Sequence, residues 1–184
     1  MILATERLIL RELDSAIDAE FVFALLNTPK FLQYIGDRGV RSVDEAAVFV
    51  EDRYRQSYRD HGFGLYAVEL RSAGSATEDT LPTGRVSASN TQIGLCGFVK
   101  RDHFESPDIG FAFLPEHEGK GYGFESARAV LDYGKHTLGF SRVLAITSQD
   151  NDVSGKLLEK LGFAFDGVKS MPDGEMLKVF SIQL

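Results

Sequence analysis

The alternation of hydrophobic and polar residues along the chain predicts a series of short strands. The segments that show it are residues 7–13, 63–70, 92–100, 108–114, 142–148, 163–169 and 176–184. Apolar residues at helical spacing predict helices at residues 14–27, 42–62, 124–138 and 151–162. The resulting order, β-α-α-β-β-β-α-β-α-β-β, indicates an α/β (α+β) fold. We expect about four helices on the two faces of one mixed, mostly antiparallel sheet of six to seven strands.

Capping and turn residues locate the ends of several elements. Asp14 suits the N-cap of the first helix, and Pro29 is a breaker that follows this helix. Ser42-Val43-Asp44-Glu45 matches a capping box, which predicts a second helix that stops near Gly62. The turn Pro172-Asp173-Gly174 predicts a hairpin between the last two strands.

The length of 184 residues is typical of one domain, which we expect to span residues 1–184. Residues 71–91 are rich in Ser, Ala, Thr and Gly, and we interpret them as a long mobile loop insertion. Cys96 is the single cysteine, which excludes an internal disulfide and fits a reducing compartment. Because it lies inside a predicted strand, we expect it to be a small buried hydrophobe.

Charge and hydropathy narrow the class of protein further. The net charge of −7 argues against a nucleic-acid partner, which usually requires a basic face. Charged residues interrupt the N-terminal apolar run, which excludes a signal peptide, and no apolar stretch approaches the roughly 20 residues that span a bilayer. The four histidines have no metal-ligand spacing, so no metal is expected. These features predict a cytoplasmic protein that binds no membrane.

A glycine-rich segment at residues 118–123 carries the clearest chemical information. Gly119, Gly121 and Gly123 lie between a predicted strand and a predicted helix. The first amides of a helix lack intrahelical partners, and glycine lets a phosphate approach them closely. The segment therefore predicts a site for a phosphate or pyrophosphate. A Walker loop does not fit because Gly121 follows Lys120, and a dinucleotide fingerprint does not fit the glycine spacing.

The same segment, Glu118-Gly119-Lys120-Gly121-Tyr122-Gly123, resembles the Gln/Arg-x-x-Gly-x-Gly/Ala motif of the GNAT acyl-CoA N-acyltransferases. The likeness is to the Rim-type branch, which acts on ribosomal proteins. Further segments match in order, at residues 5–11, 62–68, 108–111, 151–154 and 158–163. The resemblance therefore covers nearly the whole chain apart from residues 71–91.

The resemblance implies acetyl-CoA as cosubstrate. It places pyrophosphate on the backbone amides of residues 118–123, which are Glu118, Gly119, Lys120, Gly121, Tyr122 and Gly123. It also implies that two central strands, 108–114 and 142–148, splay apart, usually at a bulge, so that the pantetheine pairs with the free edge. The residues expected along the cofactor are Phe111, Phe113, Leu114, Asn151 and Ser154. Glu118 departs from the family pattern and brings a carboxylate to the phosphate site.

Amine acetylation requires a base, an oxyanion donor and a proton for the leaving thiolate. Asp108 is the first candidate for the base, because it begins the strand beside the implied cofactor site; it could equally pair with a neighbouring loop. Glu105 and His103 are weaker candidates, and His117 is better suited to contact phosphate. The oxyanion donor is expected to be a backbone N–H of residues 108–114.

Many relatives in this family use a tyrosine as the acid, at the position that Leu158 occupies here. The resemblance to the Rim-type branch suggests Ser154 instead, which could also support a helix cap. Asn151 either contacts the cofactor or caps the helix. Phe31 and Tyr34 are candidate acceptor contacts, because the segment between the first two helices overhangs the acceptor site in this fold.

These residues predict an N-acetyltransferase in which an amine attacks the thioester directly. The acceptor would be a protein N-terminal amine or a small primary amine, and the protein a monomer or homodimer. The alternative is a CoA-binding sensor or interaction module without turnover, which the missing tyrosine and Glu118 favour.

Overall fold

The computed structural model describes residues 1–71 and 91–184. The predicted loop insertion at residues 71–91 lies outside them, apart from its two end residues. Within the described residues the chain forms one eight-stranded sheet in the order β1-β2-β3-β4-β5-β6-β8-β7. The strands are β1 (Leu3–Ala4), β2 (Leu8–Arg11), β3 (Leu65–Leu70), β4 (Thr91–Val99), β5 (Asp108–Phe113), β6 (Arg142–Ser148), β7 (Ala164–Ser170) and β8 (Met176–Gln183).

All neighbouring strands are antiparallel except β5 and β6, which are parallel. The predicted mixed, mostly antiparallel sheet is therefore confirmed. The additional strand is β1, whose two residues pair with Leu10 and Ile9 of β2. Two residues are too few for a readable alternation, which is why the sequence pattern does not show this strand.

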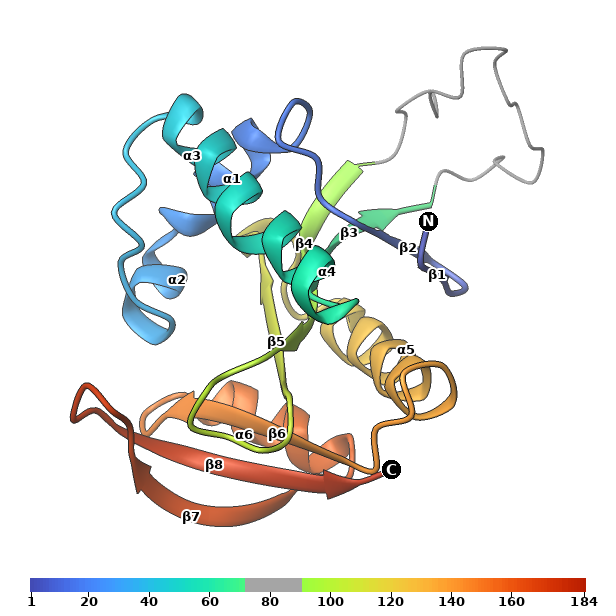
Figure 1. Ribbon diagram of the computed structural model, residues 1–184, viewed down its shortest axis with the longest axis vertical. Coiled ribbons are helices and arrows are strands. Elements are labelled where there is room, and N and C mark those ends of the chain that lie inside the picture. Colours follow the sequence, from blue (N-terminus) through green and yellow to red (C-terminus); the bar gives the residue numbers. More distant parts are fainter. Residues whose placement is uncertain (72–90) are drawn as a thin grey trace.

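Helices cover both faces of the sheet. They are α1 (Ala19–Leu26), α2 (Pro29–Tyr34), α3 (Val43–Phe49), α4 (Gln56–His61), α5 (Tyr122–His136) and α6 (Asp152–Lys160), with a π-helical turn η1 (Val50–Arg55) and a 3₁₀ turn η2 (Pro115–His117). Figure 1 shows α1 to α4 grouped on one side of the sheet, apart from α5. Two apolar clusters form the core: one joins the sheet to α5 and α6, and the other joins it to the N-terminal helices.

The sequence placed several helix ends correctly. Ser42 caps α3 by accepting the backbone N–H of Glu45, and Gly62 ends α4 in the left-handed conformation with φ 74°. One prediction was wrong: the first helix begins after Asp18 and not after Asp14, because the Asp14 side chain instead accepts the N–H of Ala16 within a turn. The first helix ends before Pro29 as predicted, but Pro29 also begins the unpredicted helix α2, at a position where the N–H that proline lacks would have no partner.

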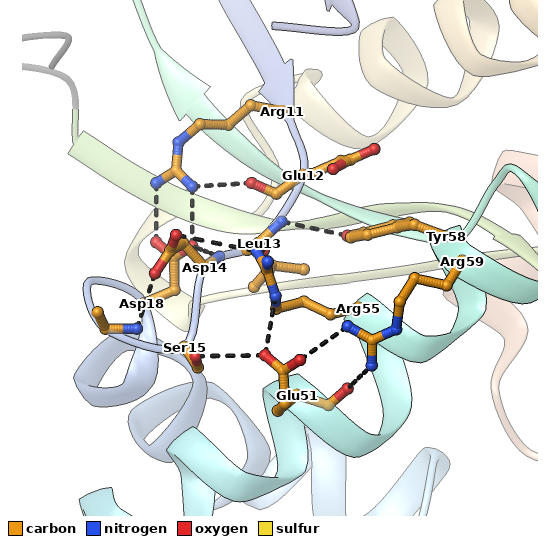
Figure 2. Close-up of polar contacts among 11 residues, drawn as sticks. Arg11, Glu12, Leu13, Asp14, Ser15, Asp18, Glu51, Arg55, Tyr58 and Arg59 are labelled. Carbon is orange, nitrogen blue, oxygen red and sulfur yellow. Dashed lines mark hydrogen bonds and ion pairs between the residues drawn. The ribbon is translucent and has the colours of Figure 1, made fainter. Parts of the chain in front are cut away.

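The interior contains one polar cluster, which joins the N-terminal helices to the sheet. Figure 2 shows the guanidinium of Arg11 facing the carboxylate of Asp18. Each of two Arg11 nitrogens donates to an Asp18 oxygen at 2.8 Å, and Arg11 also pairs with Glu69 at 2.7 Å. Cys96, by contrast, is buried among apolar residues as expected, and burial raises the pKa of its thiol to about 12. Its thiolate is therefore not formed near neutral pH.

Candidate functional site

The two parallel strands in the middle of the sheet separate almost as soon as they meet. β5 and β6 share one residue pair, Asp108 with Leu144, and the N–H of Leu144 donates to the carbonyl of Pro107 at 2.9 Å. Beyond this pair, the edge of β5 that faces β6 has no strand partner among the described residues. The predicted splay is therefore present. A bulge is not needed for it, because β5 pairs with β4 over six residue pairs without a register shift.

The glycine-rich turn lies where the two strands are apart, after the end of β5. Gly119 and Gly121 have φ of 70° and 84°, values that side chains other than glycine rarely adopt. Gly121 is also the N-cap of α5, which runs for 15 residues. A Cβ atom on Gly123 would lie 3.3 Å from Leu157 and 3.5 Å from Phe113, so the first turn of α5 packs close to β5 and α6. This geometry directs the free amides at the start of α5 toward an anion.

Arg7 holds this turn against the N-terminal segment. Its guanidinium donates to the carbonyl of Lys120 at 3.1 Å, pairs with Glu125 at 2.6 Å and lies 4.7 Å from the ring centre of Tyr122. Burial raises the pKa of Glu125, but hydrogen bonds from Thr5 and Arg7 outweigh it and lower this pKa overall. Local sequence patterns give no signal for this role of Arg7, because its partners are more than 110 positions away.

Glu118 stands at the beginning of this turn, and its carboxylate is paired. Lys30 of α2 donates its ammonium to Oε2 of Glu118. Lys120, which is exposed, forms no ion pair among the described residues and is free to meet a phosphate. His117 is half-buried, and its Nδ1 is buried without a hydrogen-bond partner in the part of the chain that the structure describes.

Asp108 lies at the closed end of the splay and is 2% exposed. Its Oδ1 accepts a hydrogen bond from Nε of Arg101 at 2.9 Å, so the pairing with a neighbouring loop that the sequence left open is present. Burial raises the pKa of the Asp108 carboxyl, and the Arg101 guanidinium only partly opposes this effect. The carboxylate therefore holds a proton more strongly than an ordinary aspartate, which is suitable for a general base.

A pocket of about 220 Å³ lies at the β4–β5 loop, and Asp108 itself does not line it. Its wall is formed by residues 103–106 of the β4–β5 loop together with Arg142, Leu144 and Lys169. Leu144 is the strand partner of Asp108, which places the pocket at the closed end of the splay. His103 and Glu105, the weaker base candidates, are both in this wall.

On the β6 side of the splay, the first turn of α6 presents polar groups. Asn151 caps α6: its Oδ1 accepts the backbone N–H of Ser154 at 3.1 Å. The Asn151 amide NH2 and the Ser154 hydroxyl have no hydrogen-bond partner among the described residues, so both can donate to a ligand. Leu158 is 1% exposed and belongs to the core, at the position where relatives with a tyrosine acid carry that residue.

The β strands themselves supply mainly apolar contacts. Phe111 and Phe113 are half-buried against the cluster that contains α5, and Leu114 packs against the N-terminal cluster. Thr147, near the end of β6, has a buried hydroxyl without a partner in the described part of the chain. A buried hydroxyl normally has a partner, so the Thr147 hydroxyl has an unused hydrogen-bonding capacity at this place. The alternation pattern of β6 gave no signal for this group.

The two acceptor candidates of α2 differ in exposure. Phe31 is 7% exposed and packs in the N-terminal core cluster, whereas Tyr34 is half-exposed at the end of the helix. Among the described residues there is no cluster of three or more metal-ligating side chains. No described helix has the length and apolar character needed to cross a membrane.

This combination of a splayed parallel strand pair and a glycine-rich helix start is that of the GNAT acetyltransferase fold. Residues 7–164 match the family described as acetyltransferase (GNAT) domain, and the chain belongs to this family.

Known relatives agree with this assignment. A Bacillus subtilis protein, uncharacterized N-acetyltransferase YoaA, is 30% identical over 169 residues, which are 91% of this chain and 85% of the relative. The ribosomal protein uS5-alanine N-acetyltransferase of Escherichia coli is 34% identical over 77 residues, 41% of this chain and 40% of the relative. The solved spermidine N-acetyltransferase of Vibrio cholerae, in complex with CoA and spermine, has a TM-score of 0.71 at 22% identity, covering 97% and 96% of the two chains.

Proposed function

We propose that this protein transfers an acetyl group from acetyl-CoA to a primary amine. The observation that carries this proposal is the free edge of β5, which begins beside Asp108 and ends at the glycine-rich turn. A pantetheine arm fits such an edge as an added strand, and a pyrophosphate fits the amides of residues 119–123, since the N–H of Glu118 already donates to the carbonyl of Pro115 at 3.3 Å. Acetyl-CoA supplies the thioester that the amine attacks. The relative from Vibrio cholerae was solved with CoA, which supports the choice of cofactor.

Different residues around the splayed strands take the separate roles that the reaction requires. Asp108 accepts the proton that the amine loses as its nitrogen bonds to the acetyl carbon, either directly or through one water. A backbone N–H of β5 stabilises the oxyanion, and the C–S bond then breaks. Ser154 donates its hydroxyl proton to the departing thiolate and regains one from solvent. Asn151 donates its amide to the cofactor, with Phe111, Phe113 and Leu114 along the pantetheine.

On the acceptor side we place Tyr34 and Phe31, with Tyr34 the more accessible of the two. The acceptor is a protein N-terminal amine, as the partial likeness to the uS5-alanine enzyme suggests, or a small amine such as the spermidine of another relative. A Rim-type role, a single domain over 1–184, a cytoplasmic location and a monomeric or dimeric state all stay predictions.

The proposal is tested by CoA calorimetry and by release of free thiol from acetyl-CoA. The acceptor panel should contain peptides with ribosomal-protein N-termini, polyamines, amino acids and aminoglycosides. We expect CoA binding, and thiol release above hydrolysis with at least one of these classes. Binding without turnover across the panel would instead favour the CoA-binding sensor, and absence of binding would contradict both functions.

A further inference from the structure

The carboxylate of Glu118 adds a negative charge to a turn that has to bind phosphates. We propose that Lys30 is a positioning residue for the cofactor. By pairing with Glu118, it holds and neutralises this carboxylate, and thereby sets the affinity of the turn for CoA. The inference rests on the proposed function, because it concerns the same turn.

The contact joins two segments that are 88 positions apart, α2 and the turn before α5. The side chains of Lys30 and Glu118 are 58% and 33% exposed. Exposed ion pairs contribute little to folding stability, so stability gives no reason for this pair. We expect the pair to act on what binds the turn, because the Lys30 ammonium is placed on a carboxylate at the start of that turn.

The helix that carries Lys30 is held in place by other contacts. Phe31 is anchored in the core, and Thr28 caps α2 by accepting the N–H of Phe31 at 3.4 Å. One turn further on, Gln33 donates its side-chain amide to Asp150 at 3.4 Å. Asp150 lies in the β6–α6 loop, whereas Glu118 lies in the β5–α5 turn. The face of α2 with Lys30 and Gln33 therefore contacts the loops that follow both splayed strands.

The charges around Glu118 determine how strongly the loss of Lys30 should affect CoA binding. Two like charges close together near a protein surface repel each other, and solvent exposure weakens this repulsion. Arg7 does not cover Glu118, because it is engaged with Glu125 and the carbonyl of Lys120, and Lys120 forms no ion pair with Glu118. Removing Lys30 leaves the carboxylate uncompensated beside the pyrophosphate. We expect this to weaken CoA binding about threefold to tenfold at low salt.

A double-mutant cycle tests the inference through the CoA dissociation constant, measured by calorimetry on the intact chain. The variants are Lys30→Met, Glu118→Gln and the pair of substitutions together. Lys30→Met should weaken CoA binding, and this loss should shrink at about 1 M salt, where charges are screened within about 3 Å. Glu118→Gln should bind at least as tightly as wild type. In the Glu118→Gln background, Lys30→Met should have no effect beyond about twofold.

A matched control is Lys135→Met, which removes the same charge from the exposed far end of α5 and should leave CoA affinity unchanged. An equal loss from Lys30→Met in both backgrounds would overturn the inference, because Lys30 would then contact phosphate directly. No loss in either background would overturn it as well. If the wild-type protein does not bind CoA, the proposed function fails first and the inference with it.

Discussion

At the scale of single residues, the burial of Asp108 affects both its proton affinity and the stability of the fold. Asp108→Asn keeps the size of the side chain and an oxygen that can accept from Arg101. The asparagine amide cannot act as a base, so we expect the rate of acetyl transfer to fall by roughly 10²–10⁴-fold. Asp132→Asn, on the exposed surface of α5, is the control and should retain the wild-type rate.

The pH dependence of the rate, compared between wild type and Asp108→Asn, shows whether Asp108 acts as a base or only as a structural carboxylate. A base must be deprotonated, so the wild-type rate should fall as the pH drops through the raised pKa of Asp108, at a higher pH than an ordinary carboxylate near ~3.9. The Asn variant should lack this acidic limb of kcat/KM. An unchanged rate and profile would show that water or another group takes the proton.

The stability of the fold should change with pH in the direction opposite to that of the reaction rate. Because the folded state holds the Asp108 proton more strongly than the unfolded chain, the free energy of unfolding decreases as the pH rises through the raised pKa. Asp108→Asn removes this decrease. The stability difference between the variant and wild type, measured with urea, should therefore shift in favour of the variant from acidic to neutral pH. A difference that does not change with pH would contradict the raised pKa.

Gly119 and Gly139 offer a matched pair for the glycine-rich turn. Both have φ near 70°, and a Cβ atom on either would meet nothing within 4 Å. Substitution by alanine should therefore cost a similar amount of stability in both cases, about 1–2 kcal/mol for a left-handed residue. Only Gly119→Ala should also weaken CoA binding, since only Gly119 lies in the proposed pyrophosphate site. Equal CoA affinities of the two variants would place the phosphates elsewhere.

At the scale of elements, α6 shows one residue with two separable roles. The Oδ1 of Asn151 caps the helix, and its NH2 is available to the cofactor. Asn151→Asp keeps the capping oxygen but loses the donor, so we expect the wild-type stability with weaker CoA binding. Asn151→Ala should lose both, with about 0.5–2 kcal/mol less stability. Thermal unfolding and CoA calorimetry distinguish these outcomes, and unchanged CoA affinity in the Asp variant would leave Asn151 as a cap alone.

Some structural elements and contacts could be predicted from the sequence, and others could not. The strands of the splay and the glycine-rich turn were predictable because alternation, glycine spacing and family resemblance all agree there. Pro29 correctly marked the end of the first helix but gave no sign of α2, because a proline suits both the end of one helix and the first position of the next. The sequence left open that Asp108 pairs with a loop, but it did not identify Arg101 as the partner. The pairing of Lys30 with Glu118 gave no signal. Such side-chain contacts depend on the packing of whole elements, which local spacing does not encode.

At the scale of the whole molecule, the Arg11 cluster joins the layer of N-terminal helices to the sheet. Asp18, at the start of α1, is fully buried and accepts from Arg11, from the N–H of Asp14 and from the side chain of Gln92. Glu69 of β3 pairs with the same guanidinium. The pKa of Arg11 is raised, chiefly through its hydrogen bond to Asp18, so the guanidinium stays charged at all ordinary pH values.

Asp18→Ala should therefore destabilise the whole fold and not one helix. The substitution leaves a half-buried guanidinium and two further donors without their main acceptor, and such losses cost about 3–5 kcal/mol. We expect the lower end of this range, because Glu69 still pairs with Arg11. For a chain of this length that corresponds to a Tm about 6–12 °C lower. Asp37→Ala is the control: it also removes an aspartate paired with an arginine, but on the surface, and should leave Tm unchanged. An unchanged Tm in Asp18→Ala, as in the control, would show that the buried cluster does not hold the two layers together.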